Sequence, residues 1–219
     1  MDVHHLRVTR SARYFLSGVS TGPVEELWIG LHGYAQLASR FLRWLTPLED
    51  GRTTLAAPEA LSRFYLETRP DGHHSPVVGA TWLTREDREV ELADVVGYLD
   101  ELARHLRATL RPSRLVVLGF SQGAVTAVRW LERGQTRPDR GVLWGVPLPA
   151  DVPADRLVAA LGGATLGLVA GDTDGYAVPG SIEADAARLA AAGARVEVRR
   201  FTGGHEITAD ALRLAAGRG

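Results

Sequence analysis

A serine between two glycines is the first candidate for chemistry in this sequence. Ser121 lies in the segment Gly119-Phe120-Ser121-Gln122-Gly123, which follows the apolar run 115–118 and precedes a run of helical character. A strand, a sharp turn and a helix are the context of a nucleophile elbow, in which the glycines leave no Cβ to block the chain. We therefore predict that Ser121 is a nucleophile at the C-terminal edge of a sheet.

A serine hydroxyl needs a base to remove its proton and an acid to orient that base. Two carboxylates, Asp172 and Asp174, follow the apolar run 165–170, and His205 follows the run 195–201. The C-terminal ends of parallel strands share one sheet edge, so all three side chains are expected near the serine. The order Ser, Asp, His is that of α/β-hydrolases. His205 is the predicted base, and the residues alone leave both aspartates open as the acid.

The oxyanion formed when a serine attacks a carbonyl needs N–H donors. One predicted donor is the backbone N–H of Gln122, the residue after the nucleophile. The other is the backbone N–H of Tyr34, in a loop after a predicted strand, where Gly33 allows a tight approach. His32 precedes that glycine, and we interpret it as shaping the loop because His205 is better placed to act as the base.

These motifs together resemble the carboxylesterase/phospholipase family of α/β-hydrolases, which includes small bacterial carboxylesterases, lysophospholipases and acyl-protein thioesterases. The resemblance runs from about Leu27 to His205. Its segments are Leu31-His32-Gly33, Gly119-Phe120-Ser121-Gln122-Gly123-Ala124, Gly171-Asp172-Thr173-Asp174 with Val178-Pro179, and Gly204-His205-Glu206-Ile207.

The resemblance implies a role for each matching residue. The implied catalytic triad is Ser121, Asp174 and His205, with oxyanion donors on Tyr34 and Gln122. The resemblance assigns the acid to Asp174, which is the later of the two aspartates and the one nearer to the Val178-Pro179 pair. Trp82 matches the family's tryptophan at the substrate pocket, and 145–149 resembles its Gly-x-x-Pro turn. The chain departs from the family at 34–36, where Leu-Gly-Asp is common, and at Ala170, where His is common. These departures concern the substrate more than the catalysis.

Other residues are candidates for substrate or metal binding. Several lie near predicted strand ends or beside the aspartate loop, and we expect them to line an apolar acyl pocket: Tyr34, Trp82, Trp144, Leu148 and Tyr176. Asp71, His73 and His74 could suggest a metal site. Adjacent side chains on an irregular loop seldom converge on one ion without a third ligand, so we expect no metal and no cofactor.

Short apolar runs alternate with longer segments of helical period, which predicts an α/β fold with a mostly parallel sheet. The predicted strands are Glu26–Leu31, Thr54–Ala57, Arg114–Gly119, Gly141–Trp144, Thr165–Ala170 and Arg195–Phe201. An antiparallel hairpin of Leu6–Thr9 and Arg13–Leu16 is predicted at the sheet edge. The clearest helix is expected to begin with Thr84 as its N-cap and to end near Leu110. The other predicted helices are Leu37–Leu45, Gln122–Glu132, Ala154–Leu161, Ser181–Ala192 and Ile207–Ala215.

The composition bounds the function. The length of 219 residues predicts one domain, 1–219, and the motifs and the resemblance imply that it is an α/β-hydrolase domain without a large cap domain. Only the irregular stretch Pro58–Leu83 could act as a partial lid. The 25 basic and 26 acidic side chains lack the basic excess of a nucleic-acid-binding protein. The sequence has no cysteine and no lysine, which excludes thiolate nucleophiles and Schiff-base chemistry. No apolar run has the length of a signal peptide or a membrane span, so we expect a soluble cytoplasmic protein.

The sequence therefore predicts a serine esterase that cleaves carboxylic esters or thioesters of small to medium acyl chains through an acyl-enzyme on Ser121. A peptidase or amide hydrolase could use the same triad. A non-catalytic binding protein that kept the pocket is the third alternative, and a missing triad member would indicate it, but none is missing. The expected partner is a small-molecule ester, with no nucleic acid and no stable membrane insertion, and a homodimer is an open option.

Overall fold

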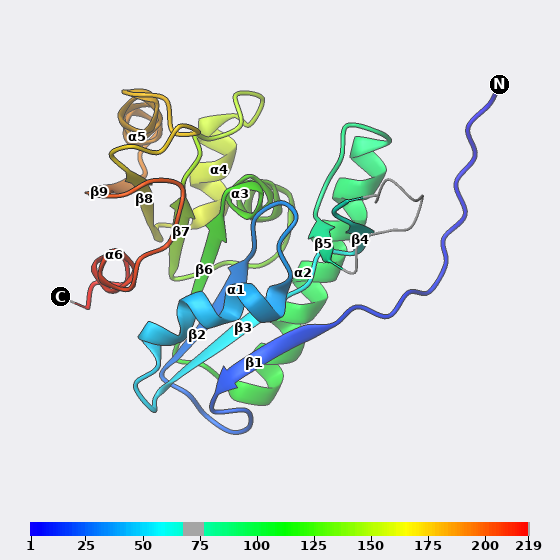
Figure 1. Ribbon diagram of the computed structural model, residues 1–219, viewed down its shortest axis with the longest axis horizontal. Coiled ribbons are helices and arrows are strands. Elements are labelled where there is room, and N and C mark those ends of the chain that lie inside the picture. Colours follow the sequence, from blue (N-terminus) through cyan, green and yellow to red (C-terminus); the bar gives the residue numbers. More distant parts are fainter. Residues whose placement is uncertain (68–76, 219) are drawn as a thin grey trace.

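The computed structural model describes residues 1–67 and 77–218 and is built on a seven-stranded sheet (Figure 1). The strand order is β1-β3-β2-β6-β7-β8-β9, with β1 antiparallel to β3 and every other neighbouring pair parallel. These strands are β1 (Tyr14–Gly18), β2 (Glu26–Leu31), β3 (Thr53–Pro58), β6 (Arg114–Phe120), β7 (Arg140–Trp144), β8 (Thr165–Gly171) and β9 (Arg195–Phe201). Asp71, His73, His74 and part of the stretch Pro58–Leu83 lie outside the described residues.

Helices cover both faces of this sheet. They are α1 (Ala38–Leu45), α2 (Arg88–Leu110), α3 (Gln122–Arg133), α4 (Ala154–Leu161), α5 (Ser181–Ala191) and α6 (Ala209–Ala215), with a short 3-10 helix at Thr46–Leu48. The buried side chains of α2, α3, α4 and α5 belong to one hydrophobic cluster, and those of α1 and α6 belong to a second. Strand β2 contributes Leu27 and Ile29 to the first cluster and Trp28 to the second, because successive strand residues point to opposite faces.

Six of the predicted strands are confirmed, each with ends within one residue of the prediction. The prediction of an irregular stretch over Pro58–Leu83 is wrong in part, because its ends form a second, two-stranded antiparallel sheet. This sheet pairs β4 (Ser62–Tyr65) with β5 (Val78–Thr81). Each strand has only four residues, too short for the periodicity of either to be recognised. The sheet is joined to the loop after β2 by a bridge between Gln36 and Ala80.

The predicted N-terminal hairpin is also wrong. The antiparallel edge strand exists as β1, but Leu6–Thr9 forms no strand, and Figure 1 shows the chain before β1 running away from the sheet. Side chains tether this segment instead: His5 Nε2 lies 2.7 Å from Asp87 Oδ2, and Arg10 donates to the carbonyl of Leu61. A local alternation of apolar and polar residues predicts a strand. It carries no information on whether a partner strand lies beside it.

The long helix α2 begins later than predicted. Asp87, and not Thr84, occupies the N-cap position, with a φ of 47°. Thr84 is engaged elsewhere: its backbone N–H and its hydroxyl donate to the carboxylate of Glu91, over 2.7 Å and 2.9 Å. A Thr followed by acidic residues satisfies the pattern of a helix start, and the bond to Glu91 decides that Thr84 stays outside the helix.

Candidate active site

Ser121 lies at the tight turn between β6 and α3. Its φ of 55° and ψ of −121° are unusual for a residue with a side chain, and its backbone N–H donates to the carbonyl of Trp144 over 2.8 Å. The flanking glycines are required, because a Cβ on Gly119 would lie 2.4 Å from the carbonyl oxygen of Gly123. A Cβ on Gly123 would lie 2.1 Å from the carbonyl oxygen of Leu31. The backbone therefore has the geometry of a nucleophile elbow.

His205 and Asp174 form a hydrogen-bonded pair at the same edge of the sheet. The Nδ1 atom of His205 lies 2.9 Å from Oδ2 and 3.1 Å from Oδ1 of Asp174. The aspartate is buried, and its Oδ1 also accepts the backbone N–H of Tyr176 over 2.9 Å. The ring of Phe120, the residue before Ser121, lies 4.8 Å from the imidazole. Engaging Nδ1 in this way leaves Nε2 as the nitrogen available to a nucleophile.

The structure separates the two aspartates that the residue pattern left open. Asp172 is exposed, and its Oδ1 accepts the backbone N–H of Gly203 over 3.0 Å. It supports the loop before His205 without contacting the imidazole. Asp174 makes that contact. The resemblance to the family implied this choice, which sequence spacing alone did not.

Gly145, after β7, leaves room for the pair. Its φ is 81°, and a Cβ there would lie 2.9 Å from His205 Cε1 and 3.3 Å from Asp174 Oδ2. Its backbone N–H donates to the carbonyl of Val169 over 2.8 Å, which holds the turn against β8. Any side chain at this position would displace the imidazole or its carboxylate.

The loop after β2 lies against the elbow. A Cβ on Gly33 would lie 3.3 Å from the Cβ of Ser121. The loop's other amides are engaged: Gly33 N–H donates to Gln36 Oε1 over 2.7 Å, and Ala35 N–H donates to Ala80 O over 2.9 Å. Within the described parts of the chain, the N–H of Tyr34 makes no hydrogen bond. Two unengaged amides, those of Tyr34 and of Gln122 at the start of α3, therefore lie on the segments that flank Ser121.

The side chain of Gln122 has a role that the sequence did not indicate. Its Nε2 donates to Thr81 Oγ1 over 2.8 Å and to the carbonyl of Leu83 over 2.9 Å, while its Oε1 accepts the backbone N–H of Trp82 over 3.1 Å. These bonds fasten the segment after β5 to the first residue of α3. The sequence could not predict these bonds, because the partners of Gln122 lie about 40 residues away in the chain.

Both ring nitrogens of His32 form hydrogen bonds with backbone groups. Its Nδ1 donates to the carbonyl of Gly33 over 2.8 Å, and its Nε2 accepts the N–H of Ala60 over 3.1 Å. Burial lowers the pKa of this imidazole, against smaller opposite effects of the Gly33 carbonyl and of Glu59. The contacts agree with a loop-shaping role and leave neither nitrogen for proton transfer.

We predict that His32 makes the free energy of unfolding depend on pH. Its folded pKa lies below the ordinary value of 6.5, so the unfolded state binds more protons between these two values, and stability falls as the pH is lowered through 6.5. One such proton contributes a slope of at most about 1.4 kcal/mol per pH unit. Urea unfolding of the wild type and of His32→Gln at pH 7.5 and 5.5 measures this pH dependence of the free energy of unfolding. An equal pH dependence in both proteins would contradict the prediction.

Most of the predicted acyl-pocket residues are buried. The indole N–H of Trp82 donates to the carbonyl of His32 over 2.8 Å, and that of Trp144 donates to the carbonyl of Glu206 over 2.9 Å. Both indoles therefore support loops of the site from inside the core. Leu148 is buried as well. Of the predicted pocket residues, only Tyr34 and Tyr176 are exposed.

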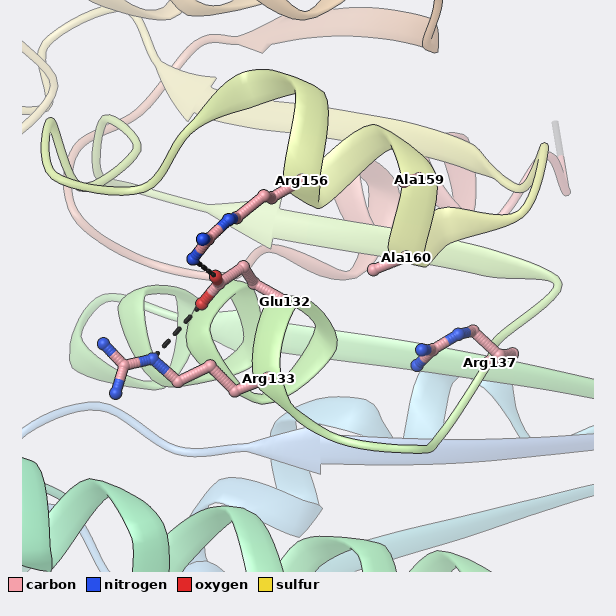
Figure 2. Close-up of a pocket in the computed structure, with 6 residues that line it drawn as sticks. All are labelled: Glu132, Arg133, Arg137, Arg156, Ala159 and Ala160. Carbon is pink, nitrogen blue, oxygen red and sulfur yellow. Dashed lines mark hydrogen bonds and ion pairs between the residues drawn. The ribbon is translucent and has the colours of Figure 1, made fainter.

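Two hollows of the surface lie outside this region. Figure 2 shows the first, a space of about 520 Å³ between α3 and α4, lined by Glu132, Arg133, Arg137, Arg156, Ala159 and Ala160. Glu132 follows Ser121 by eleven helical residues, or roughly 16 Å along α3. Its carboxylate pairs with Arg133 over 3.3 Å and with Arg156 over 3.6 Å, so these guanidinium groups are already engaged. The second space, of about 1130 Å³, separates the N-terminal segment from α2.

Neither a metal cluster nor a membrane span is evident in what the structure describes. Residues 1–67 and 77–218 contain no group of three or more His, Asp or Glu side chains arranged to hold a metal ion. Over the same ranges, no helix combines the length and the apolar character needed to cross a membrane.

The sheet order, the strained serine between β6 and α3 and the His–Asp pair beyond β8 and β9 together define the α/β-hydrolase fold. Solved structures of this class resemble the chain over nearly its whole length. No protein-family model matches the sequence, and no curated protein is similar to it.

Three solved structures illustrate the likeness. Esterase PE8 is 21% identical, with a TM-score of 0.68 over 95% of this chain and 97% of that one. The carboxylesterase of Bacillus cereus is 18% identical, with a TM-score of 0.67 over 94% and 93% of the two chains. Protein Atu2452 of unknown function from Agrobacterium tumefaciens C58 is 21% identical, with a TM-score of 0.63 over 93% and 94%. At these identities the likeness shows the fold.

Proposed function

We propose that this protein is a serine hydrolase that cleaves carboxylic esters or thioesters of small to medium acyl chains. The observation that carries the proposal is the contact of His205 Nδ1 with the buried carboxylate of Asp174, at the sheet edge that also presents Ser121. A serine in an elbow, a histidine oriented by a buried acid and unengaged amides beside the serine are the parts that acyl transfer requires. The esterases among the structural neighbours support the choice of ester substrates.

The first half of the proposed reaction forms an acyl-enzyme. The Ser121 hydroxyl oxygen bonds to the carbonyl carbon of the substrate while its proton passes to Nε2 of His205. Asp174 holds the resulting imidazolium through Nδ1. The negative oxygen of the tetrahedral intermediate accepts the N–H groups of Tyr34 and Gln122. The bond to the leaving oxygen or sulfur then breaks, and the leaving group takes the proton from His205.

The second half returns the enzyme to its starting state. Water attacks the acyl carbon, and its proton passes to His205. The same two amides hold the second oxyanion. Collapse breaks the bond between the acyl carbon and the oxygen of Ser121, which recovers its proton from the imidazolium. The products are a carboxylic acid and an alcohol or thiol, and His205 carries the proton in both halves of the reaction.

A substrate series tests the choice of bond. We expect turnover of p-nitrophenyl esters from acetate to laurate, with the highest kcat/KM for short to medium chains, and turnover of a matched thioester. The matched p-nitroanilide is expected to react more slowly, because esters and thioesters carry better leaving groups than amides. A preference for the anilide would replace the proposal with an amide hydrolase. No turnover with any member would favour a binding protein.

A further inference from the structure

Two aromatic rings lie close to the imidazole of His205. The centroid of the Tyr176 ring is 4.5 Å from that of the imidazole, at an interplanar angle of 45°. The Phe120 ring is 4.8 Å away, at 34°. Both separations fall at the short end of the range for aromatic contacts. The histidine therefore contacts a carboxylate at Nδ1 and two aromatic rings.

The local chain aims both rings. Phe120 precedes Ser121 in the elbow, is buried and packs against Trp44, with ring centroids 5.8 Å apart. Tyr176 follows Asp174 by two residues, and its backbone N–H donates to that carboxylate over 2.9 Å. The turn that orients the acid therefore also places the tyrosine ring beside the imidazole.

Burial does little to hold Tyr176 in this place, because 67% of the residue is exposed to solvent. Hydrophobic stabilisation scales with the apolar area removed from water, so a ring this exposed gains little from covering its neighbour. A cation, by contrast, is attracted to the face of an aromatic ring within about 6 Å of its centroid. An imidazole that acts as a base becomes such a cation when it takes a proton.

We propose that Tyr176 is a positioning residue for His205. Its ring holds the imidazole against the elbow and stabilises the imidazolium that forms as the Ser121 proton is transferred. This inference rests on the proposed function. An interaction that is stronger with the imidazolium than with the imidazole stabilises the transition state more than the ground state, so it raises the rate of the chemical step.

No charged group other than Asp174 contacts the imidazole among the described residues, so the effect of the Tyr176 ring on the imidazolium can be measured separately. Asp174 pairs with it directly. The other acids of the two loops face the backbone: Asp172 accepts the N–H of Gly203 over 3.0 Å, and Glu206 accepts the N–H of Gly204 over 3.4 Å. Gly145, on the side of β7, carries no charge. A change of ring at position 176 therefore alters the surroundings of the imidazole without removing an ion pair.

The test compares Tyr176→Leu, which keeps an apolar cover without a π face, with the matched control Tyr176→Phe, which keeps the ring. The readout is the NMR titration of the His205 Cε1–H signal in the resting enzyme, identified among the seven histidines by its absence in His205→Gln. We expect the midpoint in Tyr176→Leu to fall by about half a pH unit, and that in Tyr176→Phe to stay unchanged. Ester kcat should fall about 2- to 5-fold in Tyr176→Leu, with KM unchanged.

Other outcomes overturn the inference. An unchanged midpoint with a raised KM would make Tyr176 a wall of the substrate site, and a raised midpoint would show that the ring acts by excluding water. Because the NMR titration uses no substrate, it remains informative if ester hydrolysis fails. Loss of the proposed function and loss of the positioning role are therefore separate results.

Discussion

Replacing Ser121 with alanine is expected to lower ester turnover by a factor of about 10⁴ to 10⁶ and to abolish labelling by a fluorophosphonate probe. The hydroxyl oxygen is the only heavy atom lost, so the attacking nucleophile disappears while the elbow and the His205–Asp174 pair remain. Alanine has a Cβ like serine, so the strained φ of 55° is equally costly in both proteins. The melting temperature should therefore change little. Initial rates on p-nitrophenyl butyrate and gel-based probe labelling measure both effects.

A second serine provides the matched control for this experiment. Ser181, at the start of α5, donates its hydroxyl to the carbonyl of Val178 over 2.6 Å. Ser181→Ala should keep both turnover and probe labelling. If Ser121→Ala retained wild-type turnover, the assignment of the nucleophile would be refuted. Labelling that persisted in Ser121→Ala but vanished in Ser181→Ala would move the nucleophile to position 181.

Under the proposed function, Asp174→Asn is expected to lower kcat by about 10⁴, as loss of the orienting acid does in known Ser-His-Asp enzymes. The carboxylate accepts a hydrogen bond from Nδ1 of His205, so the proton sits on Nδ1 and Nε2 is free to take the serine proton. An asparagine can instead donate to Nδ1, which places the proton on Nε2 and blocks the base. The kcat of the purified variant, with probe labelling at equal protein concentration, measures the loss.

Asp172→Asn is the control two residues away in the same loop. Its carboxylate accepts the N–H of Gly203, and an asparagine oxygen can accept the same bond. We expect turnover within about 10-fold of the wild type, as for the loss of charge in an exposed hydrogen bond. The opposite ranking of the two variants would transfer the role of the acid to Asp172.

Local pattern accounts for the part of the fold that was predicted well. The strands β2, β6 and β8 are nearly continuous apolar runs because both faces of a parallel sheet are covered by helices. Such runs are visible in any short window of sequence. Glycines and polar residues interrupt them at the turns, so the ends of the strands are marked as well. Once the strand ends were predicted, the positions of Ser121 and His205 at the edge of the sheet followed from them.

Contacts between distant segments account for the predictions that were wrong. The segment 6–9 has the alternation of a strand but pairs with no strand among the described residues, whereas β4 and β5 are too short to be recognised and pair with each other. Distant contacts also bury Trp82 and Trp144, whose expected place in an acyl pocket stays a prediction. The carbonyls that accept their indole N–H groups lie 50 and 62 residues away in the chain, at His32 and Glu206.

The sequence by itself determined the α/β-hydrolase fold, the serine in its elbow and the histidine beyond the last strand, because each follows from a pattern of neighbouring residues. Residue spacing left the acid open and the family resemblance implied Asp174, but only the tertiary structure showed that Asp174 contacts His205 and that the ring of Tyr176 lies beside the imidazole. Asp172 and Asp174 are two residues apart in one loop and chemically alike, so spacing cannot rank them. The fold turns Asp174 and Tyr176 toward the imidazole and Asp172 toward the backbone of Gly203.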